Sequence, residues 1–295
     1  MKKPILGIDI GGTKIFHALI NDEGKILTEV KKEQTPKTVE EIENKLKEII
    51  KEYENETKLA GIATAGAVNN SNDKILSSTG NLPKGYRDID FKNLNENMEI
   101  FIENDANCAA WAEYKVGATK GYKNSIVLTL GTGVGGGIIV NGSLLKGKSG
   151  AAGEMHFKMS TDKKRLCTCG AYDCFEAYAS GRGLKLTYED ITGECLSTYE
   201  IIQKYDKKEE SAIKTLVKWN EYIAIGALGL NNIFDTDVIA FSGSMAQFAD
   251  IEYIEEYVNK YTVTTPTKIA IAKAGNYSGV IGAGLVAFEK TKQLD

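Results

Sequence analysis

Hydrophobic positions in the first part of the chain recur in short extended runs. One apolar run covers residues 5–10, stops at Gly11-Gly12-Thr13 and resumes over residues 15–20. The polar stretch 21–24 has turn chemistry, and a third extended run is expected from Lys25. Three successive runs of this kind predict an antiparallel meander.

The next segments alternate between helical and extended patterns. Thr38 and Glu41 form a capping-box pattern, and apolar residues from 42 to 53 recur along one helical face. Residues 59–68 predict a strand that runs into a loop of small residues, and residues 99–102 predict another. The Ala-rich stretch 106–116 then predicts a helix, with Asn104 or Asp105 placed to cap it.

The opening pattern returns at residue 125. An apolar strand is expected over 125–130, a glycine loop over 131–137, and a returning strand over 138–140. Two such units, roughly a hundred residues apart, indicate that one fold module occurs twice. Beyond them we expect a helix over 209–234, a strand over 238–242, a helix from 245, a strand over 269–272 and a helix over 278–290.

Length and charge narrow the class of protein. A chain of 295 residues favours two domains or one large one, and 42% hydrophobic residues is ordinary for a globular core. The formal net charge is −4, so the charge balance indicates neither a nucleic-acid nor a membrane partner. The N-terminal apolar run is broken at Asp9, so we expect no secretory signal and a cytoplasmic location.

The first glycine loop has the residue types of a phosphate site. Phosphate needs several converging backbone N–H groups, and glycine lets the main chain approach closely enough. Asp9-Ile10-Gly11-Gly12-Thr13-Lys14 adds a carboxylate for Mg²⁺ and a hydroxyl for phosphate oxygens. For this loop alone, a glycine-rich hairpin turn is the alternative interpretation.

The second glycine loop contains the string G-x-G-x-x-G. A dinucleotide site needs a helix after that string, whereas residues 138–142 predict a strand and a turn. This context argues against a nicotinamide dehydrogenase. Two strand–loop–strand units can instead face each other across a cleft and grip one nucleotide from both sides.

Taken in order, these motifs resemble the ROK sugar kinases of the actin-like ATPase superfamily. The matching segments are 9–14, 103–107, 131–137, 150–154, 167–176 and 274–283. The resemblance implies a two-domain α/β actin-like fold, a duplicated ribonuclease-H-like module with nucleotide and sugar in the interdomain cleft. It also implies a homodimer. We expect a small domain of residues 1–108 plus 277–295 and a large domain of residues 109–276 with a Cys-rich insertion.

The resemblance also implies a role for each matching position. Asp105 matches the catalytic base, and an aspartate within reach of a hydroxyl can take its proton; the alternative for Asp105 alone is a helix N-cap. The implied sugar-binding residues are Gly66, Asn81, Asn104, Asp105, Glu154, His156 and Glu176. The implied residues for ATP and Mg²⁺ are Asp9, Gly11, Gly12, Thr13, Lys14, Thr132, Gly133 and Gly243.

Three clustered cysteines, Cys167, Cys169 and Cys174, favour a metal over a disulfide in a reducing compartment. The resemblance implies a structural Zn²⁺ with three thiolates and one histidine. At the family's histidine position this chain has Phe157, and its own histidine is one residue earlier, His156. Three outcomes are open: His156 reaches the metal with local backbone adjustment, another ligand completes the site, or the site is empty.

The expected function is ATP-dependent phosphorylation of a hexose, with glucose and its 6-hydroxyl first. The alternatives within kinases are an N-acetylhexosamine kinase, for example for N-acetylmannosamine, and a fructokinase. The alternative from another class is a non-catalytic sugar-sensing regulator. The first glycine loop begins at Asp9, so we expect no DNA-binding domain ahead of it, and Asp105 is present. We therefore expect an enzyme.

Overall fold

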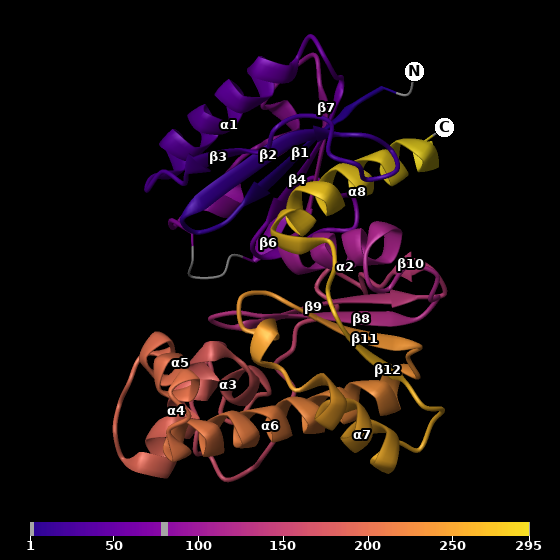
Figure 1. Cartoon of the computed structure of the whole chain (residues 1–295). Helices are drawn as coiled ribbons and strands as arrows, with labels where there is room; N and C mark the ends of the chain where they lie inside the picture. Colours follow the sequence, from indigo (N-terminus) through magenta and orange to yellow (C-terminus); the bar gives the residue numbers. More distant parts are fainter. Residues whose placement is uncertain (1–2, 78–81, 295) are drawn as a thin grey trace.

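The computed structural model describes residues 3–77 and 82–294 and contains two five-stranded sheets (Figure 1). The first sheet has the order β3-β2-β1-β4-β7: Lys31–Gln34, Lys14–Ile20, Ile5–Ile10, Leu59–Thr64 and Glu99–Asn104. The second has the order β10-β9-β8-β11-β12: Ser143–Leu144, Val134–Val140, Ser125–Leu130, Val238–Ser242 and Lys268–Ile271. A hairpin of β5 (Ala67–Val68) and β6 (Ile75–Ser77) lies beside the first sheet.

Both sheets follow one plan. In the first, β1 pairs antiparallel with β2 and parallel with β4, which pairs parallel with β7. In the second, β8 pairs antiparallel with β9 and parallel with β11, which pairs parallel with β12. The third strand of each module, β3 or β10, adds antiparallel to the outer side of the second. The shared order and direction agree with the expected repetition of one module.

Helices cover both sheets. The α-helices are α1 (Val39–Tyr53), α2 (Asp105–Val116), α3 (Glu176–Ala179), α4 (Gly181–Thr192), α5 (Thr198–Asp206), α6 (Glu210–Phe234), α7 (Ile251–Tyr261) and α8 (Ser278–Leu294). The 3-10 helices are η1 (Tyr86–Asp88), η2 (Phe91–Asn93), η3 (Ala246–Phe248) and η4 (Gly275–Tyr277). In the described chain, no helix is long and apolar enough to cross a membrane.

Three expected element boundaries are wrong. The returning strand of the second glycine loop begins at Val134 and not at residue 138, because Gly135, Gly136 and Gly137 already pair with β8. The third strand begins at Lys31 and not at Lys25, because the Asn21 side chain accepts the N–H of Lys25 and holds a wider turn. Within that turn region, Ile26 makes an isolated bridge. The helix expected from residue 245 begins at Ile251, where the Asp250 side chain caps it by accepting the N–H of Tyr253.

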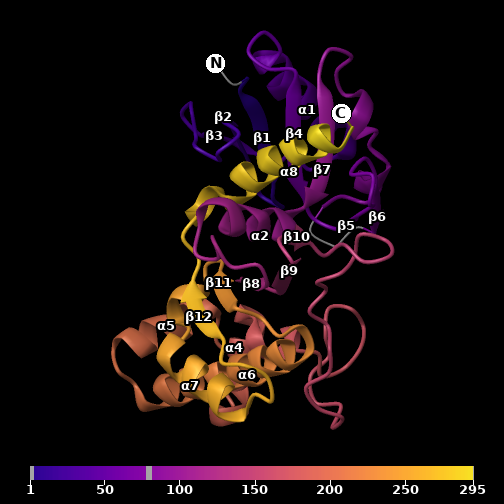
Figure 2. The same ribbon diagram turned by 90° about the vertical axis from the view of Figure 1, so that its right-hand side faces the viewer.

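The two modules interlock through α2 and α8. Helix α2 follows the last strand of the first sheet but packs on β8 and β9 of the second sheet. Helix α8 closes the chain and lies between the first sheet and α2 (Figures 1 and 2). The domain boundaries expected between 108 and 109 and between 276 and 277 stay a prediction, because α2 contacts both parts of the molecule.

Glycines let α8 lie directly on the first sheet. A Cβ atom at Gly61 would stand 1.9 Å from the Ala283 carbonyl oxygen, and one at Gly7 would stand 2.2 Å from that of Val280. Real Cβ atoms do not approach backbone so closely, so a side chain at either position would push α8 off the sheet. This contact places the start of α8 beside the end of β1.

We expect Gly61→Ala to lower the free energy of unfolding by at least about 2 kcal/mol, because the added methyl group overpacks against rigid backbone. Urea denaturation measures the change. Gly229→Ala in α6 is the matched control, since a Cβ there meets open space and the helix gains about 0.5–1 kcal/mol. Equal midpoints for Gly61→Ala and the unmodified protein would contradict the close packing.

Candidate active site

Two cavities lie between the sheets and share a wall. The first, of about 590 Å³, is lined by the ends of β1 and β11 and the start of α8, including Asp9, Gly11, Ser242, Gln247, Asn276 and Gly279. The second, of about 860 Å³, is lined by the glycine loops and the 150–154 segment, including Thr13, Gly66, Asn104, Thr132, Glu154 and Glu176. Asp105, Ala106, Thr129 and Gly243 line both. The cavities therefore meet at Asp105.

The position of Asp105 follows from the junction of β7 and α2. Asn104 is the N-cap, and its Oδ1 accepts the N–H groups of Ala106 at 2.9 Å and Asn107 at 3.1 Å. Its Nδ2 donates to the carbonyl of Gly66 at 3.0 Å. Because Asn104 caps the helix, the carboxylate of Asp105 faces the cavities, with Oδ1 accepting the Ala106 N–H at 2.8 Å.

The two aspartates of the cleft resist ionisation. The side chain of Asp105 is open to the cleft, but the protein that surrounds the cleft displaces bulk water from it. This desolvation raises the pKa of Asp105, and the negative charge of Glu154 raises it further. Burial, and then the charge of Asp105, raises the pKa of Asp9 to about 7. The Asp9 carboxylate lies against Gly279, where a Cβ would stand 2.3 Å from Oδ2. A cation in this place would favour the ionised form of both groups.

Both glycine loops are tight hairpin tips that point into the cleft. The Gly11 N–H donates to the Lys14 carbonyl at 2.9 Å, and the Gly131 N–H donates to the Gly133 carbonyl at 3.0 Å. Gly12, Thr13, Thr132 and Gly133 line the second cavity, and Gly11 lines the first. Lys14 is exposed and is not among the residues that line either cavity.

Two glutamates bring polar oxygens to the second cavity. Glu154 is exposed, and its Oε2 lies 3.5 Å from Nε2 of His156. Glu176 is 9% exposed; its Oε2 accepts the N–H of Val134 at 3.3 Å, and its Oε1 accepts the hydroxyl of Thr168. Glu176 thus also holds the second glycine loop. Asn81, the remaining expected sugar ligand, lies outside the described residues.

The chain is similar to known sugar kinases over nearly its whole length. The model of the ROK family matches residues 5–290. A glucokinase from Streptomyces coelicolor is 30% identical over 318 residues, which cover 96% of this chain and 97% of that protein. An N-acetyl-D-glucosamine kinase from Haemophilus influenzae is 32% identical over 312 residues, with coverages of 96% and 99%. The solved ROK family glucokinase of Streptomyces griseus, in complex with glucose and AMPPNP, has a TM-score of 0.80 at 28% identity and covers 97% of this chain and 99% of that one.

The chain belongs to the ROK family. The two-domain, actin-like α/β fold expected from the sequence is confirmed for this ROK protein. The expected class of enzyme, a sugar kinase, agrees with all three relatives.

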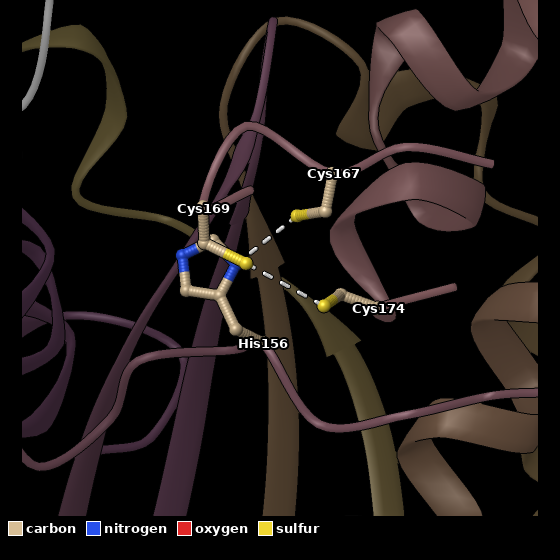
Figure 3. A group of neighbouring side chains, drawn as sticks. All are labelled: His156, Cys167, Cys169 and Cys174. Atoms are coloured by element: carbon tan, nitrogen blue, oxygen red, sulfur yellow. Dashed lines mark hydrogen bonds between the residues drawn. The ribbon is translucent and has the colours of Figure 1, made fainter. Parts of the chain in front are cut away.

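The three clustered thiols and one imidazole of this ROK protein point toward one another (Figure 3). Cys169 Sγ lies 3.7 Å from Cys174 Sγ, and Cys167 Sγ lies 3.4 Å from Nδ1 of His156. The four ligand atoms all lie within 4.8 Å of one another. Zn–S bonds of about 2.3 Å at tetrahedral angles separate two sulfurs by about 3.8 Å, so the residues fit a structural Zn²⁺.

The shifted histidine has a structural explanation. Residues 157–159 run antiparallel to 173–175, with the Phe175 N–H donating to the Phe157 carbonyl at 2.8 Å. Neighbouring side chains of an extended segment point to opposite sides. Phe157 stacks on Phe175 with ring centroids 5.0 Å apart, and His156 therefore faces the thiols. Of the three outcomes left open by the sequence, the structure supports the one in which His156 reaches the cluster.

Sequence reasoning missed several residues that line the cleft: Thr129, Thr168, Arg182, Gln247, Asn276, Ser278 and Gly279. The 274–283 segment carried a usable signal, because it matches the family and its glycines allow close approach to Asp9. Thr168 lies within the matching segment 167–176, where only the cysteines and Glu176 were assigned a role. Arg182 carried no signal, since a single polar residue in a helix has no distinguishing pattern.

Proposed function

We propose that this ROK protein transfers the γ-phosphoryl group of ATP to the 6-hydroxyl of a hexose, with glucose as its preferred substrate. One observation carries the proposal: Asp105 stands where the two cavities meet, with its helix capped by Asn104. A base in that place touches both a sugar in one cavity and the end of a triphosphate in the other. The S. griseus relative with glucose and AMPPNP supports this assignment.

In this proposal ATP occupies the first cavity. The adenosine lies against the loop after β11, around Gly243, and the phosphates run toward the hairpin tips at Gly12 and Thr132. Glycine at these tips leaves backbone N–H groups accessible to phosphate oxygens. Asp9 would hold Mg²⁺, and a cation there would counter the burial and the Asp105 charge that raise the pKa of Asp9 to about 7. The cation would supply charge neutralisation for the phosphates.

The sugar occupies the second cavity, with its hydroxyls on Asn104, Glu154 and Glu176. Asp105 accepts the proton of the attacking hydroxyl as its oxygen bonds to the γ-phosphorus, and the bond to the β–γ bridging oxygen breaks to release ADP. The raised pKa of Asp105 makes it a stronger base than an ordinary aspartate. Positioning and charge neutralisation supply the remainder of the catalysis.

Two sugar classes compete for the second cavity. The glucokinase and the N-acetyl-D-glucosamine kinase relatives are similarly close in sequence, at 30% and 32% identity. An N-acetyl group needs its own pocket beside the sugar ring. We therefore keep N-acetylhexosamine phosphorylation as the second candidate. A homodimer and a cytoplasmic location are separate predictions, which rest on the family resemblance and on the sequence.

A panel of hexoses and N-acetylhexosamines, assayed by ADP release, tests the assignment. We expect kcat/KM for glucose to exceed that for N-acetylglucosamine, N-acetylmannosamine and fructose by about 10-fold or more, the usual discrimination of a shaped pocket. A higher value for an N-acetylhexosamine would transfer the assignment to that class. Sugar binding by calorimetry without turnover on any sugar would indicate a sensor.

A further inference from the structure

A buried ion pair lies next to the second cavity without lining it. Nζ of Lys146 is 2.8 Å from Oε2 of Glu103, and the side chains are 14% and 1% exposed. Nζ also donates to the carbonyl of Asn69 at 2.9 Å and to Oδ1 of Asn72 at 3.1 Å. An ammonium group has three protons to donate, so each has a partner.

The carboxylate of Glu103 is equally well bound. Besides Lys146, Oε2 accepts the side-chain amide of Asn72 at 2.8 Å. Oε1 accepts the backbone N–H of Asn104 at 2.9 Å and the side-chain amide of Asn107 at 3.0 Å. Buried charges are tolerated when their remaining hydrogen-bonding capacity is satisfied, and this pair meets that condition.

The pair joins three segments that are far apart in the sequence. Glu103 stands two residues before Asp105 at the end of β7. Asn69 and Asn72 form the turn of the β5–β6 hairpin, which follows Gly66. Lys146 follows β10 of the second sheet and begins the segment that leads to Glu154. One ammonium group thus ties the segment that follows the second sheet to the end of β7 in the first sheet and to the β5–β6 hairpin beside it.

Further contacts seat the 146–152 segment on the hairpin. The side-chain amide of Asn70 donates to the carbonyls of Gly147 at 3.2 Å and Lys148 at 3.1 Å. A Cβ at Gly150 would stand 1.7 Å from the Val68 carbonyl, so the two backbones touch. The N–H of residue 152 donates to the carbonyl of Lys146 at 3.2 Å and closes the segment two residues before Glu154.

We propose that Lys146 is a positioning residue for catalysis. It acts through Glu103 to fix the segment that leads to Glu154 relative to the β7–α2 junction that carries Asp105. This assignment rests on the proposed function for the roles of Asp105 and Glu154. It accounts for a lysine that lies beside the cleft yet lines neither cavity. A small misplacement of reacting groups is costly in rate, and the ion pair prevents it.

Steady-state kinetics of Lys146→Met test the proposal. We expect kcat to fall and KM for the sugar to rise, each by about tenfold, while KM for ATP stays within about twofold. Lys146→Arg retains the charge and should recover most of kcat/KM. The double variant Glu103→Gln, Lys146→Met leaves no buried charge unpaired, and should be no more impaired than Lys146→Met because the two residues act as a unit. Lys148→Met, on an exposed side chain of the same segment, is the control.

Hydrogen exchange provides a test that does not depend on turnover. In Lys146→Met we expect the amides of residues 145–155 to exchange at least about tenfold faster than in the unmodified protein. In Lys148→Met we expect the same amides to exchange at the rate of the unmodified protein. Unchanged exchange, or a lowered melting temperature with an unchanged KM for the sugar, would overturn the positioning role. An unmodified protein without sugar-dependent turnover would contradict the proposed function, and faster exchange in Lys146→Met would still support the tie between the segments.

Discussion

Asp105→Asn is expected to lower kcat by about 10²–10⁴-fold, the usual contribution of a general base. Asparagine has the size and the hydrogen-bonding reach of aspartate but cannot take the proton of the sugar hydroxyl. Because Asn104, and not Asp105, is the cap of α2, the substitution leaves the helix start intact. Steady-state ADP release gives kcat, and calorimetry should show sugar affinity within about threefold of the unmodified protein.

The pH profile of the unmodified protein provides a second readout of the same group. Desolvation by the surrounding protein, and then the charge of Glu154, raise the pKa of Asp105, and the base must be ionised to act. The rate should therefore fall as pH falls through a pKa above the ordinary aspartate range. Asp88→Asn, on an exposed residue of η1, is the control and should leave kcat unchanged. A kcat for Asp105→Asn within about threefold of the unmodified value would show that another group is the base.

The second large effect concerns the cluster of His156, Cys167, Cys169 and Cys174. We expect the purified protein to hold one Zn²⁺ per chain, and Cys174→Ser to lose it and to melt at least about 10 °C lower. The binding free energy of a structural zinc, about 10 kcal/mol or more, is also folding free energy. Each kcal/mol shifts the melting temperature of a domain of this size by about 2–4 °C.

Atomic absorption and thermal melting measure these two quantities. Burial is the main cause that raises the pKa of the Cys174 thiol to about 12. A bound cation would reverse that shift, so zinc uptake should release protons. Cys195→Ser is the matched control, because Cys195 is an exposed thiol outside the cluster. A protein with well under one metal per chain and an unchanged melting temperature in Cys174→Ser would exclude a structural metal.

Local patterns carried most of the fold prediction. The strand–glycine-loop–strand unit at residues 5–20 and its repeat from residue 125 depend on alternation and turn residues that lie next to one another in the chain. The capping box at Thr38 is local in the same way, and the structure confirms it. The third strand was placed too early because its start depends on a turn that the Asn21 side chain widens.

The site was harder to predict where distant segments decide the outcome. The sequence did not distinguish Asn104 from Asp105 as the cap. In the structure the Asn104 Oδ1 accepts the first N–H groups of α2, while its Nδ2 is held by the carbonyl of the distant Gly66. The imidazole of His156 faces the thiols because Phe175, which is remote in the sequence but stacked on Phe157, holds that ring on the opposite side of the segment. The ion pair of Lys146 and Glu103 joins the segment after β10 to the end of β7, and it has no sequence signature.

The most direct test of the central claim is product analysis by ³¹P NMR and mass spectrometry after incubation with Mg·ATP and glucose. We expect one glucose 6-phosphate for each ADP formed, and negligible ADP when the sugar is left out. ADP formation that needs no sugar and yields inorganic phosphate, or sugar binding with neither product, would contradict the assignment of this protein as a hexose kinase.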